Sequence, residues 1–133
     1  MTLEQIKGIN VPSDDNAMLF LWTTAPMLKK ALDVMDTWGF SYRTCAVWDK
    51  ELFGTGFYFR GQHEILLLGK KGEFKAPEQE NRNSSIIREK RGEHSKKPGI
   101  VYEIIERMYP KERYLELFAR SKRNGWESWG NEP

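Results

Sequence analysis

Continuous apolar runs alternate along the chain with segments of helical periodicity. Residues 17–22, Ala-Met-Leu-Phe-Leu-Trp, are apolar throughout and lie between two polar segments, 14–16 and 23–24. A short run with such boundaries is typical of a strand buried on both faces of a sheet. The run 65–68 predicts a second buried strand, and residues 42–48 predict another strand ahead of it.

Two helices are predicted, each opened by a proline. Pro26 and Pro98 suit the first helical turn, where an amide would have no partner within the helix. In both segments, apolar residues recur at helical spacing on one side. These apolar faces consist of Met27, Leu28, Ala31, Leu32 and Met35 in the first helix, and of Ile100, Val101, Ile104, Ile105 and Met108 in the second.

The order of these elements predicts an α/β fold. A strand, a helix and a strand in succession imply a parallel, right-handed crossover. Residues 114–119 predict a strand after the second helix, residues 85–87 a short strand, and residues 70–83 a loop. We therefore expect one domain over residues 1–133, built on a mostly parallel sheet that is flanked by helices.

The composition is ordinary for a soluble globular domain, with 39% hydrophobic and 30% charged residues. The longest apolar run has about six residues, far fewer than the roughly 20 that span a bilayer. Residues 1–7 lack the pattern of a secretory signal. Cys45 has no second cysteine with which to form an internal disulfide, which favours a reducing compartment. We expect a cytoplasmic protein without a membrane segment.

The net charge is only +2, but cations gather in two segments of the sequence. The clusters consist of Arg88, Lys90, Arg91, Lys96 and Lys97, and of Arg120, Lys122 and Arg123. Folding could place both clusters on one face that binds nucleic acid. A solvated surface of mixed charge is equally consistent, because Glu89 and Glu93 dilute the first cluster.

Three polar side chains lie at positions where a bound ligand, or a partner within the protein, would explain them. Glu116 interrupts an apolar strand, so its carboxylate needs either a ligand such as a ribose or a salt bridge with Arg113 or Arg120. Lys97 precedes a helix whose positive end already attracts anions, so it could bind a ligand carboxylate or phosphate, or remain solvated. Asn131 follows Trp129-Gly130 in a turn and could contact an adenine edge or lie on the surface.

Aromatic and polar residues are interleaved just ahead of the run 65–68. Arg60 and His63-Glu64 follow the triplet Phe57-Tyr58-Phe59. Such a segment could stack on an extruded or single-stranded base, or it could form an aromatic cluster in the core with a satisfied histidine. Two histidines and one cysteine match no metal-ligand spacing, so no metal site is expected.

A series of short motifs stands in order along almost all 133 residues. The motifs are Leu19-Phe20-Leu21-Trp22-Thr23, Trp38-Gly39-Phe40, Val47-Trp48, His63-Glu64, Leu68-Gly69, Gly92-Glu93-His94-Ser95-Lys96-Lys97-Pro98, Tyr102-Glu103-Ile104-Ile105-Glu106-Arg107, Glu116-Leu117-Phe118-Ala119-Arg120, Gly125-Trp126 and Trp129-Gly130-Asn131. Together they resemble the adenine-N6 methyltransferase family. That family includes the catalytic subunit of the messenger-RNA N6-adenosine methyltransferase and bacterial and phage DNA methyltransferases.

The resemblance implies a Rossmann-like methyltransferase fold with its motifs in permuted order, and S-adenosylmethionine as the cofactor. By resemblance, the cofactor-binding residues are Lys97 for the methionine carboxylate, Glu116 and Arg120 for the ribose, and Phe118 and Asn131 for the region of the adenine. Glu64 would help to hold the target adenine, with Arg60 and His63 beside it. Arg91, His94 and Lys96 are further candidates for contact with nucleic acid.

The catalytic motif of that family, Asp-Pro-Pro followed by an aromatic residue, does not occur among these 133 residues. In the family it holds the exocyclic amine of adenine towards the methyl group. We therefore expect a methyltransferase-like domain without its N-terminal catalytic strand. Residues 17–22 would then form an unpaired edge that invites a second chain, either a copy of this one or another methyltransferase subunit.

The leading hypothesis is an S-adenosylmethionine-dependent N6-adenine methyltransferase that acts on nucleic acid, on DNA rather than RNA. The missing segment would come from upstream sequence or from a partner chain. The alternative is a non-catalytic scaffold of the same fold that binds nucleic acid or a methyltransferase partner.

Overall fold

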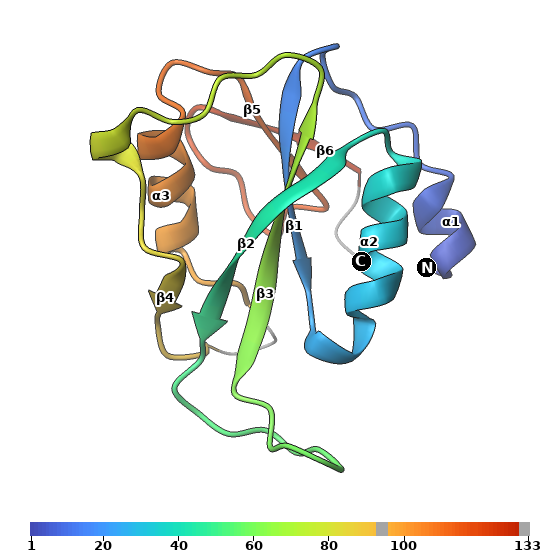
Figure 1. Cartoon of the computed structure of the whole chain (residues 1–133), viewed down its shortest axis with the longest axis vertical. Coiled ribbons are helices and arrows are strands. Elements are labelled where there is room, and N and C mark those ends of the chain that lie inside the picture. The colour runs from blue at the N-terminus through green and yellow to red at the C-terminus, as the bar shows by residue number, and fades with distance from the viewer. Residues whose placement is uncertain (93–95, 131–133) are drawn as a thin grey trace.

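The computed structural model describes residues 1–92 and 96–130, which form a mixed α/β structure (Figure 1). The helices are α1 (Leu3–Lys7), α2 (Leu28–Thr37) and α3 (Ile100–Met108), with short 3-10 helices at η1 (Ala25–Met27) and η2 (Gln79–Asn81). The strands are β1 (Ala17–Thr23), β2 (Ser41–Asp49), β3 (His63–Lys71), β4 (Ile86–Arg88), β5 (Tyr114–Leu117) and β6 (Trp126–Trp129). No helix of the described part is long and apolar enough to cross a membrane.

The larger sheet has the strand order β1-β3-β2-β4. Strand β3 runs antiparallel to both of its neighbours, with Leu67 opposite Leu21 of β1 and opposite Cys45 of β2. Strands β1 and β2 are therefore parallel to each other, as the strand–helix–strand order predicts, but β3 separates them. Strand β4 pairs with β2 in parallel.

The prediction of a mostly parallel sheet is wrong for the pairs around β3. Residues 50–62 join β2 to β3 without a helix, so the chain turns back and pairs antiparallel with the strand that it has just left. A parallel neighbour would need a crossover connection. The structure therefore confirms an α/β fold, and its larger sheet is mixed.

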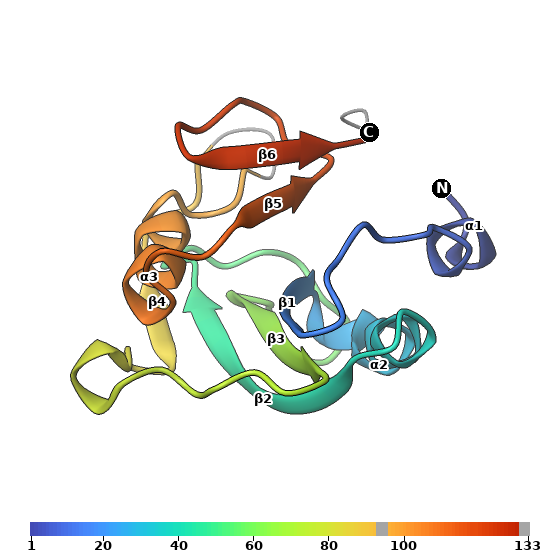
Figure 2. The ribbon, with the colours of Figure 1, turned by 90° about the horizontal axis from the view of Figure 1, so that it is seen from above.

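A second sheet consists of β5 and β6, which pair in parallel with Glu116 opposite Ser128. Figure 2 shows this small sheet above the larger one, with β5 on the side nearer β1. The sequence predicts β5 but no strand at the two C-terminal tryptophans, which begin and end β6. Gly130, the first residue of the predicted turn, has a φ of 79°, and Asn131 lies outside the described residues.

The core has two parts because successive residues of β3 point to opposite faces of the sheet. Leu67 packs with Met35 of α2 and with Phe40 on one face. Leu66 packs on the other face in a cluster with Trp48, Ile87, Val101 and Ile104, the last two from α3. Helices α2 and α3 thus cover opposite faces of the sheet, as Figures 1 and 2 show.

Strand β1 is an edge of the larger sheet, as expected for residues 17–22. Only Thr23 is buried, and the six apolar residues before it are half-buried. The run does pack on both faces of the sheet, with Phe20 and Trp22 against one core cluster and Leu19 and Leu21 against the other, but these side chains are only partly buried. The pattern does hold for β3, where Leu66 and Leu67 are buried.

Both predicted helices are present and begin where their prolines indicate. Pro26 lies in η1, which leads directly into α2, and Pro98 lies two residues before α3. Helix α1 was not predicted. Its N-terminus has a capping box, in which Thr2 and Gln5 each bond the backbone amide of the other.

Candidate functional site

A buried carboxylate with two lysines lies at the end of the larger sheet where β2 ends and β3 begins. Glu64 is only 8% exposed. Its Oε1 accepts a hydrogen bond from Lys97 Nζ at 2.5 Å, and its Oε2 accepts one from Lys50 Nζ at 3.2 Å. Lys50 directly follows β2 and Lys97 lies just before α3, so three separate segments build this cluster.

Two tryptophans form the apolar part of the same cluster. Trp22, near the end of β1, and Trp48 of β2 meet edge to face with ring centroids 5.7 Å apart. The ammonium group of Lys97 lies 5.5 Å from the ring of Trp22, and that of Lys50 lies 5.8 Å from the ring of Trp48. Each lysine therefore interacts with both the Glu64 carboxylate and an aromatic ring.

The two lysines keep Glu64 ionised despite its burial. Burial would raise the pKa of Glu64, but the hydrogen bonds and charges of Lys97 and Lys50 outweigh it and hold the pKa below its usual value. The side chain of Lys97 is 41% exposed, whereas that of Lys50 is 16% exposed. An ammonium group has three donors, so Lys97 can bind a further anion from solvent without leaving Glu64.

Two carboxylates of the protein itself lie near the start of α3. Glu64 pairs with Lys97, and Glu89 Oε2 accepts a hydrogen bond from the Gly99 amide at 3.1 Å. Sequence analysis assigned Lys97 and Glu64 to different ligands and did not identify Lys50. No local signal in the sequence distinguishes Lys50, which follows the strand after Asp49.

A second carboxylate, Glu116 of β5, is held by a tyrosine of α3. Tyr102 Oη lies 2.6 Å from Glu116 Oε1 and 2.8 Å from Oε2, and its hydroxyl donates to the carboxylate. Burial, followed by the hydrogen bond and charge of Glu116, raises the pKa of Tyr102 to about 12. The predicted partner Arg113 instead pairs with Glu127 at 3.3 Å.

The ring of Tyr102 contacts Arg123 and Trp126, which are held in place by hydrogen bonds to Glu106. The guanidinium of Arg123 lies 5.0 Å from the ring of Tyr102 and donates two hydrogen bonds to Glu106, at 2.9 and 3.0 Å. Trp126 Nε1 donates to the same carboxylate at 2.7 Å, and its ring meets Tyr102 edge to face. The hydrogen bonds from Arg123 and Trp126 lower the pKa of Glu106.

Phe118 lies at the carboxyl end of β5 in a backbone conformation that is rare for a bulky residue. Its φ is 58°, and its amide donates to the carbonyl of Trp129 at 2.9 Å. A Cβ added at Gly130 would lie 2.9 Å from the Phe118 ring, so these two residues are in close contact. Strained backbone of this kind is concentrated at functional sites.

The partners of both carboxylates lie at the start of α3. Lys97, the partner of Glu64, precedes this helix, and Tyr102, the partner of Glu116, is the third residue of the helix. A hollow of about 440 Å³ lies at the opposite end of α3, between residues 73–78 and Met108–Pro110.

Several predicted nucleic-acid residues lie at the same end of the sheet as Glu64. His63 opens β3 opposite Asp49, and Arg60 places its guanidinium 4.9 Å from the Phe53 ring. The Arg91 amide donates to the Lys50 carbonyl at 3.1 Å. This bond holds the segment that carries Arg88, Lys90 and Arg91 beside the end of β2. The side chains of Arg60, His63, Arg91 and Lys96 are exposed. His94 and Asn131 lie outside the described residues.

The described residues contain no group of three His, Cys, Asp or Glu side chains that could hold a metal ion. The described residues do bring together two carboxylates with polar partners, Glu64 with Lys97 and Glu116 with Tyr102. These features define a mixed α/β structure with two polar clusters whose partners lie at the start of α3.

Comparison with known proteins identifies the family. The MT-A70 family model matches residues 1–132, so the chain belongs to the MT-A70 family, which confirms the resemblance drawn from the motifs. The chain is 37% identical over 135 residues to the Type II methyltransferase M.MunI of Mycoplasma sp, with 99% of this chain and 58% of the relative aligned.

Eukaryotic relatives match over the same extent of the chain. The N(6)-adenosine-methyltransferase MT-A70-like protein of Arabidopsis thaliana is 31% identical, with 99% of this chain and 21% of the relative aligned. The human N(6)-adenosine-methyltransferase catalytic subunit METTL3 is 28% identical, with 99% and 24% aligned. The chain thus spans a little over half of the bacterial relative and about a quarter or less of these two eukaryotic ones.

Proposed function

We propose that this chain is the S-adenosylmethionine-binding part of an N6-adenine methyltransferase that acts on nucleic acid. Membership of the MT-A70 family supports the reaction class. The observation that carries the proposal is the arrangement around α3, with Lys97 at its start and Glu116 held by Tyr102. In this proposal Lys97 is the cation and Glu116 the hydroxyl acceptor that one extended, zwitterionic ligand would contact.

The proposed cofactor site uses residues from three elements. Lys97 would neutralise the methionine carboxylate, and its partly exposed ammonium group has donors left for this purpose. Glu116 would accept hydrogen bonds from the ribose hydroxyls, since a carboxylate can accept more bonds than the Tyr102 hydroxyl supplies. Phe118, Arg120 and Asn131 would complete the ribose and adenine contacts. The bound cofactor would supply an electrophilic methyl group.

The proposed target site is centred on Glu64. Its lowered pKa keeps the carboxylate ionised at neutral pH, so it can accept a hydrogen bond from an adenine amine. Arg60, His63, Arg91 and Lys96 lie at the same end of the sheet and would contact the phosphates or bases around that adenine. His94 belongs to the same proposed set.

DNA is the proposed substrate rather than RNA. Identity to the Type II methyltransferase is 37%, against 31% and 28% for the two relatives whose names specify adenosine, the ribonucleoside. The difference is small, so the experiment below compares the two polymers directly.

Methyl transfer is proposed to need a further segment with Asp-Pro-Pro and an aromatic residue, from upstream sequence or from a partner chain. Residues 1–133 contain no such motif. Among the described strands, β1 pairs with β3 alone and β5 with β6 alone. Each therefore has a free edge of backbone donors and acceptors that an added strand could occupy. The half-buried apolar residues of β1 would become covered by such an addition.

The alternative proposal is a non-catalytic scaffold that binds nucleic acid or a methyltransferase partner. The exposed side chains of Arg60, Arg91 and Lys96 would serve such binding without any catalytic step. The two proposals differ in one outcome, because only the enzyme gains methyl transfer when the segment is supplied.

The experiment measures N6-methyladenine by mass spectrometry after incubation of the chain, alone and extended by a segment with Asp-Pro-Pro-Trp, with cofactor and DNA or RNA. We expect methylated DNA from the extended chain only, and a raised KM for the cofactor in Lys97→Met. Lys75→Met is the control, since Lys75 is 87% exposed and pairs with Glu78. Binding of DNA without transfer in either form would favour the scaffold.

A further inference from the structure

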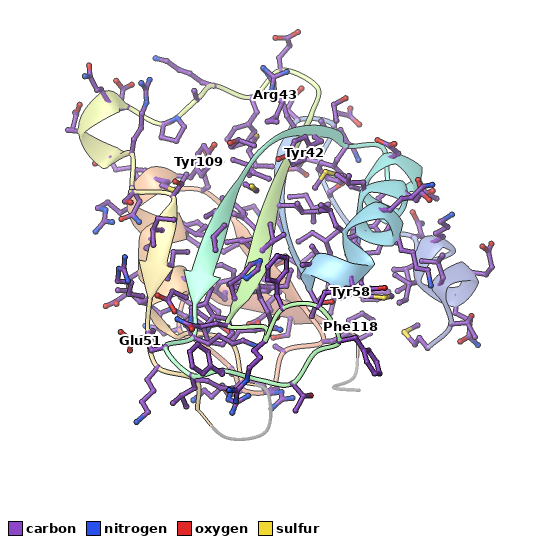
Figure 3. The ribbon with its side chains drawn as sticks, turned by 60° about the horizontal axis from the view of Figure 1, so that its bottom comes forward. Tyr42, Arg43, Glu51, Tyr58, Tyr109 and Phe118 are labelled. Carbon is purple, nitrogen blue, oxygen red and sulfur yellow. The ribbon has the colours of Figure 1, made fainter. Side chains whose placement is uncertain are left out.

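The connection between β2 and β3, residues 50–62, carries three consecutive aromatic rings at its far end. Figure 1 shows this connection extending beyond the sheet, and Figure 3 labels Tyr58 on it. Phe57, Tyr58 and Phe59, here called the aromatic tip, are 104%, 98% and 90% exposed. Large aromatic side chains in full contact with water, side by side, indicate an interaction site, whereas a single exposed ring does not.

Hydrogen bonds hold the base of the connection, whereas the three rings at its tip are exposed to solvent. The Lys50 amide donates to the Gln62 carbonyl at 2.9 Å, and the Gly54 amide donates to the Gly61 carbonyl at 2.6 Å. Gln62 Nε2 also donates to Asp49 Oδ1 at 3.0 Å. Residues 50–62, here called the arm, are therefore held together at their base by hydrogen bonds across the connection, and the aromatic tip lies at their far end.

A close backbone turn shapes the arm just before the tip. A Cβ added at Gly56 would lie 2.1 Å from the Phe59 carbonyl oxygen, so no other residue fits there without rearrangement. Arg60 folds its guanidinium back over the ring of Phe53 at 4.9 Å. These contacts involve the residues around the tip, and they leave the three rings themselves free.

Exposed cations surround the base of this arm. The backbone of residues 89–91 runs beside it, with the Arg91 amide 3.1 Å from the Lys50 carbonyl. Arg60, Arg88, Lys90, Arg91 and Lys96 are all exposed. The described carboxylates nearby are Asp49, which pairs with Arg88, Glu51, and Glu89, which accepts from the Gly99 amide, so the five cations outnumber three acidic groups.

We propose that the aromatic tip stacks on unstacked bases of the nucleic acid, while the cations at the base of the arm bind its phosphates. Rings that stack on bases beside a positively charged surface are the common way to hold a single strand, and apolar side chains inserted between bases open a duplex. This inference rests on the proposed function, and it identifies the element that holds the strand next to the target adenine.

Charge favours nucleic acid over a protein partner for this surface. A ring can stack on a base of any sequence, and the phosphates of the same strand match the cations around the arm. A protein partner would have to offer an acidic patch beside an apolar pocket. The test below distinguishes a protein partner from nucleic acid.

The test uses the purified chain with Phe57→Ala, Tyr58→Ala and Phe59→Ala, singly and combined. Affinity is measured by fluorescence anisotropy for a single-stranded and a duplex oligonucleotide, each containing 2-aminopurine beside adenine. Tyr42→Ala is the matched control, because Tyr42 is 46% exposed and lies near the start of β2, away from the arm (Figure 3). Thermal unfolding and S-adenosylmethionine binding are recorded for each variant.

The proposal expects a loss of affinity of the order of 10-fold for each ring that stacks, and a smaller change of 2-aminopurine fluorescence on binding than the unchanged chain produces. The control should bind as the unchanged protein does. Unfolding temperatures should not change, since the three rings have no contacts to lose. Binding to the single strand alone would mean that the arm takes bases already unstacked, and a change in 2-aminopurine fluorescence in the bound duplex as well would mean that it also opens a duplex.

Three results would overturn the proposal, and they separate it from the proposed function. Equal nucleic-acid affinity of the triple variant and the unchanged chain would exclude the tip and leave the proposed function intact. A change from dimer to monomer in the triple variant, with unchanged DNA affinity, would assign the tip to a second copy of this chain. Failure of the unchanged chain to bind either oligonucleotide would overturn both proposals.

Discussion

Replacing Glu64 with glutamine is expected to lower the free energy of unfolding at neutral pH because two lysines lose their counter-charge. Glutamine keeps the size of the side chain and removes its charge. The side chain of Glu64 is 10% exposed, that of Lys50 is 16% exposed and that of Lys97 is 41% exposed. The perturbation therefore acts on one well-buried ion pair and one partly solvated pair.

The expected size follows from this exposure. The bond from Lys50 should be worth about 1.5 kcal/mol, the lower end for hydrogen bonds to charged groups. The contribution of Lys97 is discounted for solvent screening to about 0.5 kcal/mol. The sum of about 2 kcal/mol corresponds to a fall in the unfolding temperature of about 7 °C for a chain of this length.

The effect should also depend on pH in a defined direction. The pKa of Glu64 is lowered in the folded protein from its ordinary value of 4.5, because Lys97 and Lys50 outweigh the effect of burial. Its stabilising contribution is then fully present above pH 4.5 and is lost as the pH falls through the folded pKa. The difference between the protein and Glu64→Gln should therefore shrink in acid.

Urea unfolding followed by tryptophan fluorescence, at neutral and acid pH, measures both effects. Glu127→Gln is the matched control, because Glu127 forms an ion pair with Arg113 at 3.3 Å with side chains 64% and 77% exposed. This control should change stability by less than about 0.5 kcal/mol. If Glu64→Gln at neutral pH is as stable as the control, the account of a buried, doubly paired carboxylate is refuted.

Two further substitutions test the second carboxylate and the strained end of β5. Tyr102→Phe removes the hydroxyl that donates to Glu116, so we expect a loss of about 1–2 kcal/mol in unfolding free energy and weaker cofactor binding by calorimetry. Cofactor affinity equal to that of the unchanged chain would show that Tyr102 does not position Glu116. Gly130→Ala forces a Cβ to within 2.9 Å of the Phe118 ring at a φ of 79°, at a cost of about 1–2 kcal/mol in thermal denaturation. Gly61→Ala, where a Cβ meets nothing within 4 Å, should change little, and equal effects of the two alanines would contradict the strain argument.

Local sequence signals predicted the individual elements better than their assembly. Prolines and helical spacing located α2 and α3, and the apolar run 65–68 located β3. The position of β3 between β1 and β2 was missed, because residues 50–62 carry no periodic pattern that shows how the chain returns. That information lies in long-range pairing rather than in any local run.

In the candidate site, the sequence identified individual residues but not the residues that they contact. The unfavourable position of a carboxylate in an apolar strand correctly indicated that Glu116 needs a partner, but Tyr102 comes from a separate helix. Glu64 and Lys97 were each identified by resemblance, yet their direct ion pair joins residues 33 positions apart. Lys50 was missed because a single cation after a strand has no distinctive local pattern.

Calorimetric titration of S-adenosylmethionine tests the central proposal most directly, with the unchanged chain, Lys97→Met and Glu116→Gln compared under one set of conditions. The account predicts measurable binding that each substitution weakens by at least about 10-fold, the loss of one charged hydrogen bond. Lys75→Met, on an exposed ion pair, should bind as the unchanged chain does. No binding by the unchanged chain, or equal binding by all four proteins, would contradict a cofactor site built around α3.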